Sequence, residues 1–169
     1  MSRREKLSKF LFSLKTEAVE GFVAKENFVD GKKVKEISFY EPSHGDFAFG
    51  GRYLEKTEKN VEAVELKVHE LLISARYFPT KDKRGIMPKL AGKHEVMLAQ
   101  FYQLLVFKQQ KKDFTAVIAR SINSLGKLTI LNAYWLPGDG CSTKNNWFIS
   151  SESIAHEYIF DAGTQVAFI

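Results

Sequence analysis

The sequence of 169 residues contains a single cysteine, Cys141, and four prolines. One cysteine excludes an internal disulfide, and no group of cysteine and histidine residues has the spacing of a zinc site. No apolar run reaches the length of a membrane span, and the N-terminal residues alternate charge with Leu and Phe, unlike a signal peptide. We therefore expect a cytoplasmic protein with no membrane partner and no disulfide framework.

Two common catalytic signatures are also missing. The chain has no Gly-x-x-x-x-Gly-Lys loop, and Gly50-Gly51 alone does not specify a phosphate site. It has no Gly-x-Ser-x-Gly elbow for a nucleophilic serine. Neither internal repeats nor low-complexity linkers interrupt the chain, so we expect residues 1–169 to form a single domain.

The sequence does have a large apolar fraction and a mild excess of positive charge. Hydrophobic residues make up 44% of the chain and include 14 phenylalanines, which predicts a globular protein with a buried core. The net charge is +5, from 25 Lys and Arg against 20 Asp and Glu. This balance fits a phosphate-rich partner such as nucleic acid but does not require one, because many ordinary proteins are this basic.

The most informative stretch covers residues 45–67. Gly-Asp-Phe-Ala-Phe opens one apolar run, Val-Glu-Ala-Val-Glu-Leu-Lys forms the next, and a charged segment at residues 55–60 separates them. This pattern predicts a β-hairpin with a turn at residues 55–60. Asp46 opens the first strand, and Glu65 and Lys67 are two residues apart on the second, so they share one face. The hairpin would thus bring three ionisable groups together.

Such a group has a specific chemical use. Two carboxylates form the all-oxygen environment that a hard cation such as Mg²⁺ prefers. A neighbouring lysine can orient a metal-bound water and offset the charge of a phosphate. A simpler interpretation is a surface hairpin on which Glu65 and Lys67 are only a solvated pair.

These residues resemble the PD-(D/E)XK motif of the restriction-endonuclease-like nuclease superfamily. That motif is an acidic residue opening one strand, followed by hydrophobic-(Asp/Glu)-X-Lys at the end of the next. Here the match consists of Asp46 and Glu65-Leu66-Lys67, while His44-Gly45 stand where the family name has proline. The other acid-x-Lys triplet, Asp30-Gly31-Lys32, falls in a turn with no strand before it.

The resemblance implies a Mg²⁺-dependent endonuclease that hydrolyses DNA, with Mn²⁺ as a substitute metal. Asp46, Glu65 and the backbone carbonyl of Leu66 would hold the metal, Lys67 would position the attacking water, and Glu17 on an N-terminal helix would join the catalytic group. Cleavage of both DNA strands would require a symmetric homodimer. The DNA backbone would be bound by the basic residues of segment 79–93, which are Lys81, Lys83, Arg84, Lys89 and Lys93.

The expected fold is α/β: a restriction-endonuclease-like core of an N-terminal helix, a mixed sheet with the motif hairpin and a second helix, followed by a β-rich C-terminal third. Apolar spacing predicts the helices at residues 2–20 and 93–110. Strands are expected at 34–40, 114–122, 127–136, 147–150, 157–160 and 165–169, with an extended segment at 22–28 and a helical turn at 151–155. Helix and strand cannot be distinguished over residues 71–78.

A second class of function fits the same sequence. The chain would then be a non-catalytic binding module for a nucleic-acid or protein partner, of phage, plasmid or toxin–immunity type, with the aromatic-rich β half as its partner surface. The positions of Glu65 and Lys67 distinguish the two classes. Convergence with Asp46 at metal-ligand distance favours the nuclease, whereas exposure of Glu65 and Lys67 to solvent on the outer side of the sheet would exclude it and leave the binding module. DNA and RNA both remain open as partners.

Overall fold

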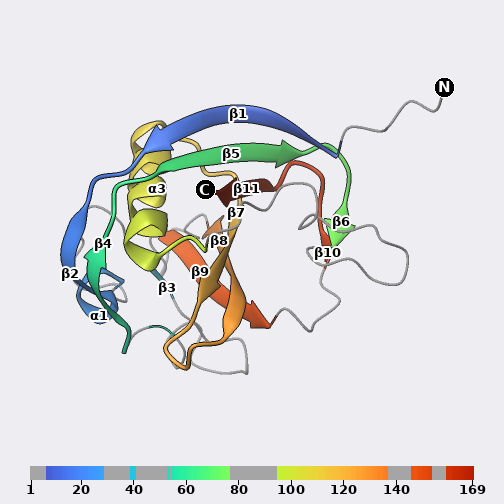
Figure 1. Cartoon of the computed structure of the whole chain (residues 1–169). Helices are drawn as coiled ribbons and strands as arrows, with labels where there is room; N and C mark the ends of the chain where they lie inside the picture. The colour runs from blue at the N-terminus through green and yellow to red at the C-terminus, as the bar shows by residue number, and fades with distance from the viewer. Residues whose placement is uncertain are drawn as a thin grey trace, which may run out of the picture.

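The computed structural model describes residues 7–28, 39–40, 53, 55–76, 95–136, 146–153 and 159–169. These residues form a mostly β structure with two short helices. The strands are β1 (Ser8–Lys15), β2 (Val19–Val23), β3 (Phe39–Tyr40), β4 (Thr57–Val61), β5 (Glu65–Leu71), β6 (Ala75–Arg76), β7 (Val117–Ile122), β8 (Leu128–Leu136), β9 (Asn146–Ser153), β10 (Ile159–Phe160) and β11 (Gln165–Phe168). The helices are α1 (Ala24–Asn27) and α3 (Leu98–Gln110) (Figure 1).

The principal element is a seven-stranded mixed sheet in the order β1-β5-β11-β7-β8-β9-β3. The β11–β7 and β3–β9 pairs are parallel, and the other neighbours are antiparallel. The last strand of the chain, β11, lies between β5 and β7, so both ends of the sequence contribute to one sheet. Two short ribbons, β2–β4 and β6–β10, complete the described strands.

The β1–β5 and β2–β4 pairs are two halves of one bent antiparallel ribbon. β1 leads directly into β2, and β4 leads directly into β5. At the bend, the N–H of Thr16 donates to the carbonyl of Val64 (2.9 Å), and the N–H of Val64 donates to Oγ1 of Thr16 (3.0 Å). In Figure 1, β1 and β5 run as a long pair beside α3, and the ribbon turns into β2 and β4 beyond it.

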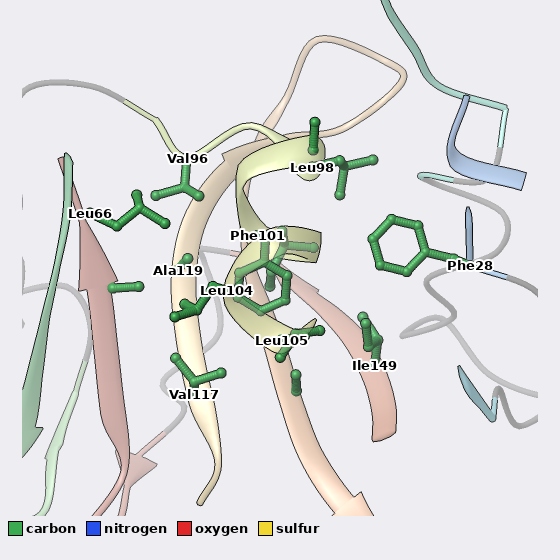
Figure 2. Packing of buried hydrophobic residues seen from close by; sticks show 14 of the residues in the cluster. Phe28, Leu66, Val96, Leu98, Phe101, Leu104, Leu105, Val117, Ala119 and Ile149 are labelled. Carbon is green, nitrogen blue, oxygen red and sulfur yellow. The ribbon is translucent and has the colours of Figure 1, made fainter. Parts of the chain in front are cut away.

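Helix α3 packs on one face of the sheet and forms the main core with it. Phe101, Leu104 and Leu105 are fully buried. They belong to one core cluster with Leu66, Val117, Ala119 and Ile149 of the sheet strands (Figure 2). The helix presents these residues at three- and four-residue spacing, whereas each strand presents every second residue. Burial of each such side chain stabilises the fold by roughly 1.5–3 kcal/mol.

A smaller apolar cluster occupies the opposite face of the sheet. Its buried members are Leu71, Ala75, Ile118, Ile130, Phe160 and Val166. Ile118 and Ile130 alternate with the α3-facing residues of β7 and β8, as the two-residue period of a strand requires. This cluster lies toward the end of β5 that carries Leu71, which is the end farthest from Glu65.

The prediction of an N-terminal helix over residues 2–20 is wrong, because the described part of this segment forms β1 and β2. The residues that gave a helical stripe also fit a strand that contains a bulge. The register with β5 shifts between Phe10 and Phe12, so Leu11 is the extra residue. Phe12 and Leu14 then pack on the α3 side, while Phe10 lies on the other face beside His69.

The predicted motif hairpin is also wrong in its strand pairing. Residues 57–61 form β4 and pair with β2, although a charged turn was expected at 55–60. The second strand begins at Glu65 and lies between β1 and β11. Both neighbours of β5 are therefore strands other than the one that was expected to begin at Asp46. Asp46 itself lies outside the described residues.

Several other boundaries differ from the sequence-based expectation. The second helix begins at Leu98 and not at residue 93, because the N–H of Val96 donates to the carbonyl of Arg120 and holds residues 95–96 along β7. Residues 24–27 are helical within the expected extended segment, and residues 151–153 continue β9 where a helical turn was expected. The β7–β8 hairpin and β11 are confirmed. No helix in the described part of the chain is long and apolar enough to cross a membrane.

Candidate nucleic-acid interface

The candidate site is the side of β1, β5 and β11 that faces away from α3. We call it the open face and define it by Phe10, Ser13, Lys15, Glu65, Lys67, His69 and Phe168. Strand register arranges these residues in three rows. Phe10 lies opposite His69, Ser13 lies opposite Lys67 with Phe168 on the other side of Lys67, and Lys15 lies opposite Glu65.

Glu65 and Lys67 share one face, as their two-residue spacing predicts. Both side chains are exposed, whereas the intervening Leu66 and the following Val68 are buried in the α3 core. In the part of the chain that the structure describes, neither Glu65 nor Lys67 forms an ion pair, and the same holds for Lys15. The open face therefore presents two cations and one carboxylate to solvent.

The other predicted site residues are not brought to this face in the described structure. Glu17 lies between β1 and β2, is exposed, and exchanges backbone hydrogen bonds with the side-chain amide of Gln103 on α3 (2.8 and 3.0 Å). Leu66 takes part in the β1–β5 ladder opposite Leu14. Asp46 and the predicted phosphate-binding residues Lys81, Lys83, Arg84, Lys89 and Lys93 lie outside the described residues.

A metal site is not formed by the described residues alone. They contain no group of three or more His, Cys, Asp or Glu side chains placed to hold a metal ion. On the open face, Glu65 provides one carboxylate. A divalent cation bound there would need further oxygen ligands, such as the predicted Asp46, to complete its coordination.

His69 occupies the centre of the aromatic part of the open face. Its ring lies 5.6 Å from that of Phe10 at an interplanar angle of 74°, and 5.1 Å from that of Phe168. Nδ1 of His69 is 3.0 Å from the hydroxyl oxygen of Ser8. Burial lowers the pKa of His69, and the positive charge of Lys67 lowers it further. His69 is therefore mostly neutral at pH 7.

A second polar group, missed by the sequence analysis, lies inside the fold near the start of α3. Glu58 of β4 is almost completely buried, and its carboxylate accepts hydrogen bonds from the N–H groups of Leu98 (3.0 Å) and Ala99 (2.9 Å). Lys56 pairs with the same carboxylate at 3.4 Å. Because Glu58 neutralises the N-terminus of α3, that end of the helix is not free to bind a phosphate.

Tyr53 lies beside this group and is fully buried, with its hydroxyl bonded to that of Thr129. Burial raises the pKa of Tyr53, the neighbouring hydroxyls of Thr129, Ser121 and Ser151 offset part of this, and the charge of Glu58 adds to it. Because its hydroxyl is buried and bonded to Thr129, Tyr53 connects residue 53 to β8 in the interior of the fold. The burial of Glu58 had no signal in the sequence, because Glu58 lies in the charged segment at residues 55–60.

A third polar group fixes the other end of α3. Lys108 is fully buried in the last turn, and its ammonium donates to Oδ2 of Asp113 (2.7 Å) and to the side-chain oxygen of Gln165. Burial lowers the pKa of Lys108, and Asp113 offsets part of this shift. The three side chains are hydrogen-bonded to one another. The group therefore connects the end of α3, the segment before β7, and β11.

Comparison of the chain with protein-family models, curated protein sequences and solved structures finds no significant match. The interpretation of the open face therefore depends on its own residues and on the motif resemblance of Glu65-Leu66-Lys67.

Proposed function

We propose that the protein binds nucleic acid through the open face. The observation that carries this proposal is the pair of exposed lysines, Lys15 and Lys67, which project from adjacent strands and have no ion-pair partner among the described residues. Unpaired lysines on a sheet surface bind phosphate oxygens and release counterions from the nucleic acid. Ser13 between them adds a hydroxyl that can donate to the same phosphates.

Three other cations of the described structure are already engaged. Lys56 and Lys108 are bonded to the carboxylates of Glu58 and Asp113, and Arg120 pairs with Glu95 at 2.6 Å. The N-terminus of α3 is occupied by Glu58. Six other described lysines are also exposed and form no ion pair with a described residue: Lys9, Lys25, Lys59, Lys111, Lys112 and Lys127. The open face differs in having two such lysines on neighbouring strands, on the same side of the sheet as the exposed ring of Phe10. The net charge of the whole chain, +5, is also of the sign that attracts a polyanion such as nucleic acid.

A direct test measures binding of labelled DNA and RNA by fluorescence anisotropy. The double substitution Lys15→Gln/Lys67→Gln should weaken binding and reduce the slope of log affinity against log salt by about two, since two phosphate contacts are lost. Lys127→Gln is the matched control, because Lys127 is an exposed lysine in the β7–β8 turn. An equal loss in the control, or no binding by the parent protein, would reject the proposal.

Hydrolysis of DNA is the second candidate function, which the motif resemblance of Asp46 and Glu65-Leu66-Lys67 suggests, although the exposed placement of Glu65 and Lys67 counts against it. In this proposal Glu65, the carbonyl of Leu66 and Asp46 would hold Mg²⁺ or Mn²⁺, and Lys67 would position the attacking water. The bound metal would supply a positive charge opposite the phosphate. The exposure of Glu65 and Lys67 on the outer side of β5 favours binding over catalysis. Double-strand cleavage would additionally require a homodimer.

Nicking of supercoiled plasmid separates the two functions. The parent protein is incubated with Mg²⁺ or Mn²⁺ beside Asp46→Ala, Glu65→Gln and Lys67→Ala. Cleavage that disappears in all three folded variants, with DNA binding retained in Asp46→Ala and Glu65→Gln, would support the nuclease. Binding without cleavage by the parent protein, combined with no measurable Mg²⁺ or Mn²⁺ binding, would leave the binding function and exclude the nuclease.

A further inference from the structure

We propose that the open face recognises an unpaired nucleic-acid strand, with Phe10 as the surface on which a base stacks. This inference rests on the proposed nucleic-acid binding and names its substrate class. Phe10 has 52% of its surface exposed, although it is a large aromatic residue in the middle of a strand. A flat exposed ring beside free cations is the combination that single-strand-binding proteins use.

The β-bulge at Leu11 is what places Phe10 on this face. Without the extra residue, Phe10 and Phe12 would be two positions apart on one strand and would point the same way. Phe12 packs against Phe107 of α3, with ring centroids 5.4 Å apart. The register shift turns Phe10 to the opposite side, where it meets His69. Bulges commonly redirect a side chain in this manner next to functional sites.

The surroundings of Phe10 hold the aromatic surface in place. His69 packs edge-on against Phe10, is bonded to Ser8 at Nδ1, and contacts Phe168 on its other side. A base that stacks on Phe10 therefore meets a supported ring, which loses little conformational entropy on binding. The lowered pKa of His69 leaves its ring mainly uncharged at neutral pH, which suits contact with a base.

The distance between the aromatic and basic parts fits a nucleic-acid strand that runs along β1 and β5. His69 and Lys67 are two residues apart on β5, about 7 Å along the strand. The row of Glu65, with Lys15 opposite it on β1, lies about 7 Å further. A backbone phosphate can contact Lys67 or Lys15 while an attached base reaches Phe10. In a duplex the bases are stacked on one another and cannot cover Phe10. The arrangement therefore selects unpaired DNA or RNA.

The test compares three labelled ligands of about 12 nucleotides, namely single-stranded DNA, single-stranded RNA of the same sequence and the blunt DNA duplex. Binding to the full-length chain is measured by anisotropy. We expect both single strands to bind at least about tenfold more tightly than the duplex. The relative affinity of the DNA and RNA strands tells which of the two is preferred.

Two substitutions at Phe10 examine stacking itself. Phe10→Leu keeps an apolar side chain but removes the ring, and it should weaken single-strand binding about tenfold without changing the salt slope. Phe10→Trp should retain binding, and its added fluorescence should be quenched by the bound strand. Phe114→Leu is the matched control, because Phe114 is 36% exposed and stacks on Trp135 at the other end of the sheet.

Duplex binding as tight as single-strand binding, or an equal effect of Phe10→Leu and Phe114→Leu, would overturn this inference and leave the proposed function intact. Failure of the parent protein to bind any of the three ligands would instead overturn the proposed function. Thermal unfolding of each variant shows whether it is folded.

Discussion

The ammonium of Lys108 lies 2.7 Å from the carboxylate of Asp113, and its side chain is completely buried. Gln165 of β11 bonds to both partners, donating to Oδ2 of Asp113 at 2.9 Å and accepting from Lys108. The ammonium also lies 6.0 Å from the ring centroid of Trp147. This pair therefore connects the end of α3 to the strand that joins the two halves of the sheet.

Removal of the acidic partner should be strongly destabilising. Asp113→Asn leaves the Lys108 ammonium buried without a counter-charge, and we expect a loss of about 2–4 kcal/mol in the free energy of unfolding. Asp161→Asn is the control, because Asp161 is exposed in the turn before β11. Urea denaturation measures both. A loss for Asp113→Asn no larger than for the control would show that Lys108 is not held by this carboxylate.

The same pair predicts acid sensitivity. Partial burial alone would raise the pKa of Asp113, but hydrogen bonds from the side chains of Lys108, Gln165 and Thr115 and the charge of Lys108 outweigh it and lower the pKa to about 2. In the unfolded chain Asp113 takes up its proton at higher pH, so its stabilising contribution is complete above about pH 5 and is lost between about pH 4 and 2. Because the carboxylate is partly exposed, we expect this contribution to be about 1–2 kcal/mol.

Urea denaturation across this pH range measures the effect. The parent protein should lose more stability than Asp113→Asn between about pH 5 and 2, since the variant lacks the titrating group. Parallel curves for the two proteins would contradict the shifted pKa.

Glu58 should be important for the stability of α3, because its carboxylate bonds to two N–H groups of the first turn and to Lys56. Glu58→Ala removes the cap and leaves those groups unpaired, with an expected loss of about 2–4 kcal/mol. Glu62→Ala is the control, since Glu62 is exposed just after β4. Denaturation of both variants is the measurement, and similar losses would mean that the buried cap contributes little.

Lys67 should control the protonation of His69 on the open face. The Lys67 charge is one of the two causes that lower the pKa of His69, so Lys67→Gln should raise that pKa toward its ordinary value. Lys15→Gln, one row further along, should change it less. NMR titration of the His69 ring gives the values, and an unchanged pKa in Lys67→Gln would place the ammonium away from the ring.

The local sequence pattern was sufficient to predict an element when the residues that pack or pair with it are close to it in the sequence. The β7–β8 hairpin follows from two apolar runs around Asn123 and Gly126, and the apolar stripe of α3 follows from its own spacing. The shared face of Glu65 and Lys67 likewise requires only that residues 65–67 form a strand. In each case the determining interactions span a few residues.

Tertiary structure decided the features that depend on pairing between distant segments. The stripe of Phe10, Leu11 and Leu14 suits a helix, but pairing with β5 makes a bulged strand instead and turns Phe10 outward. The insertion of β11 beside β5, more than 90 residues later in the chain, and the burial of Glu58 under α3 have no local signal. Composition and periodicity determine which side chains are apolar enough to be buried. Which strand pairs with which depends on the packing of the whole sheet.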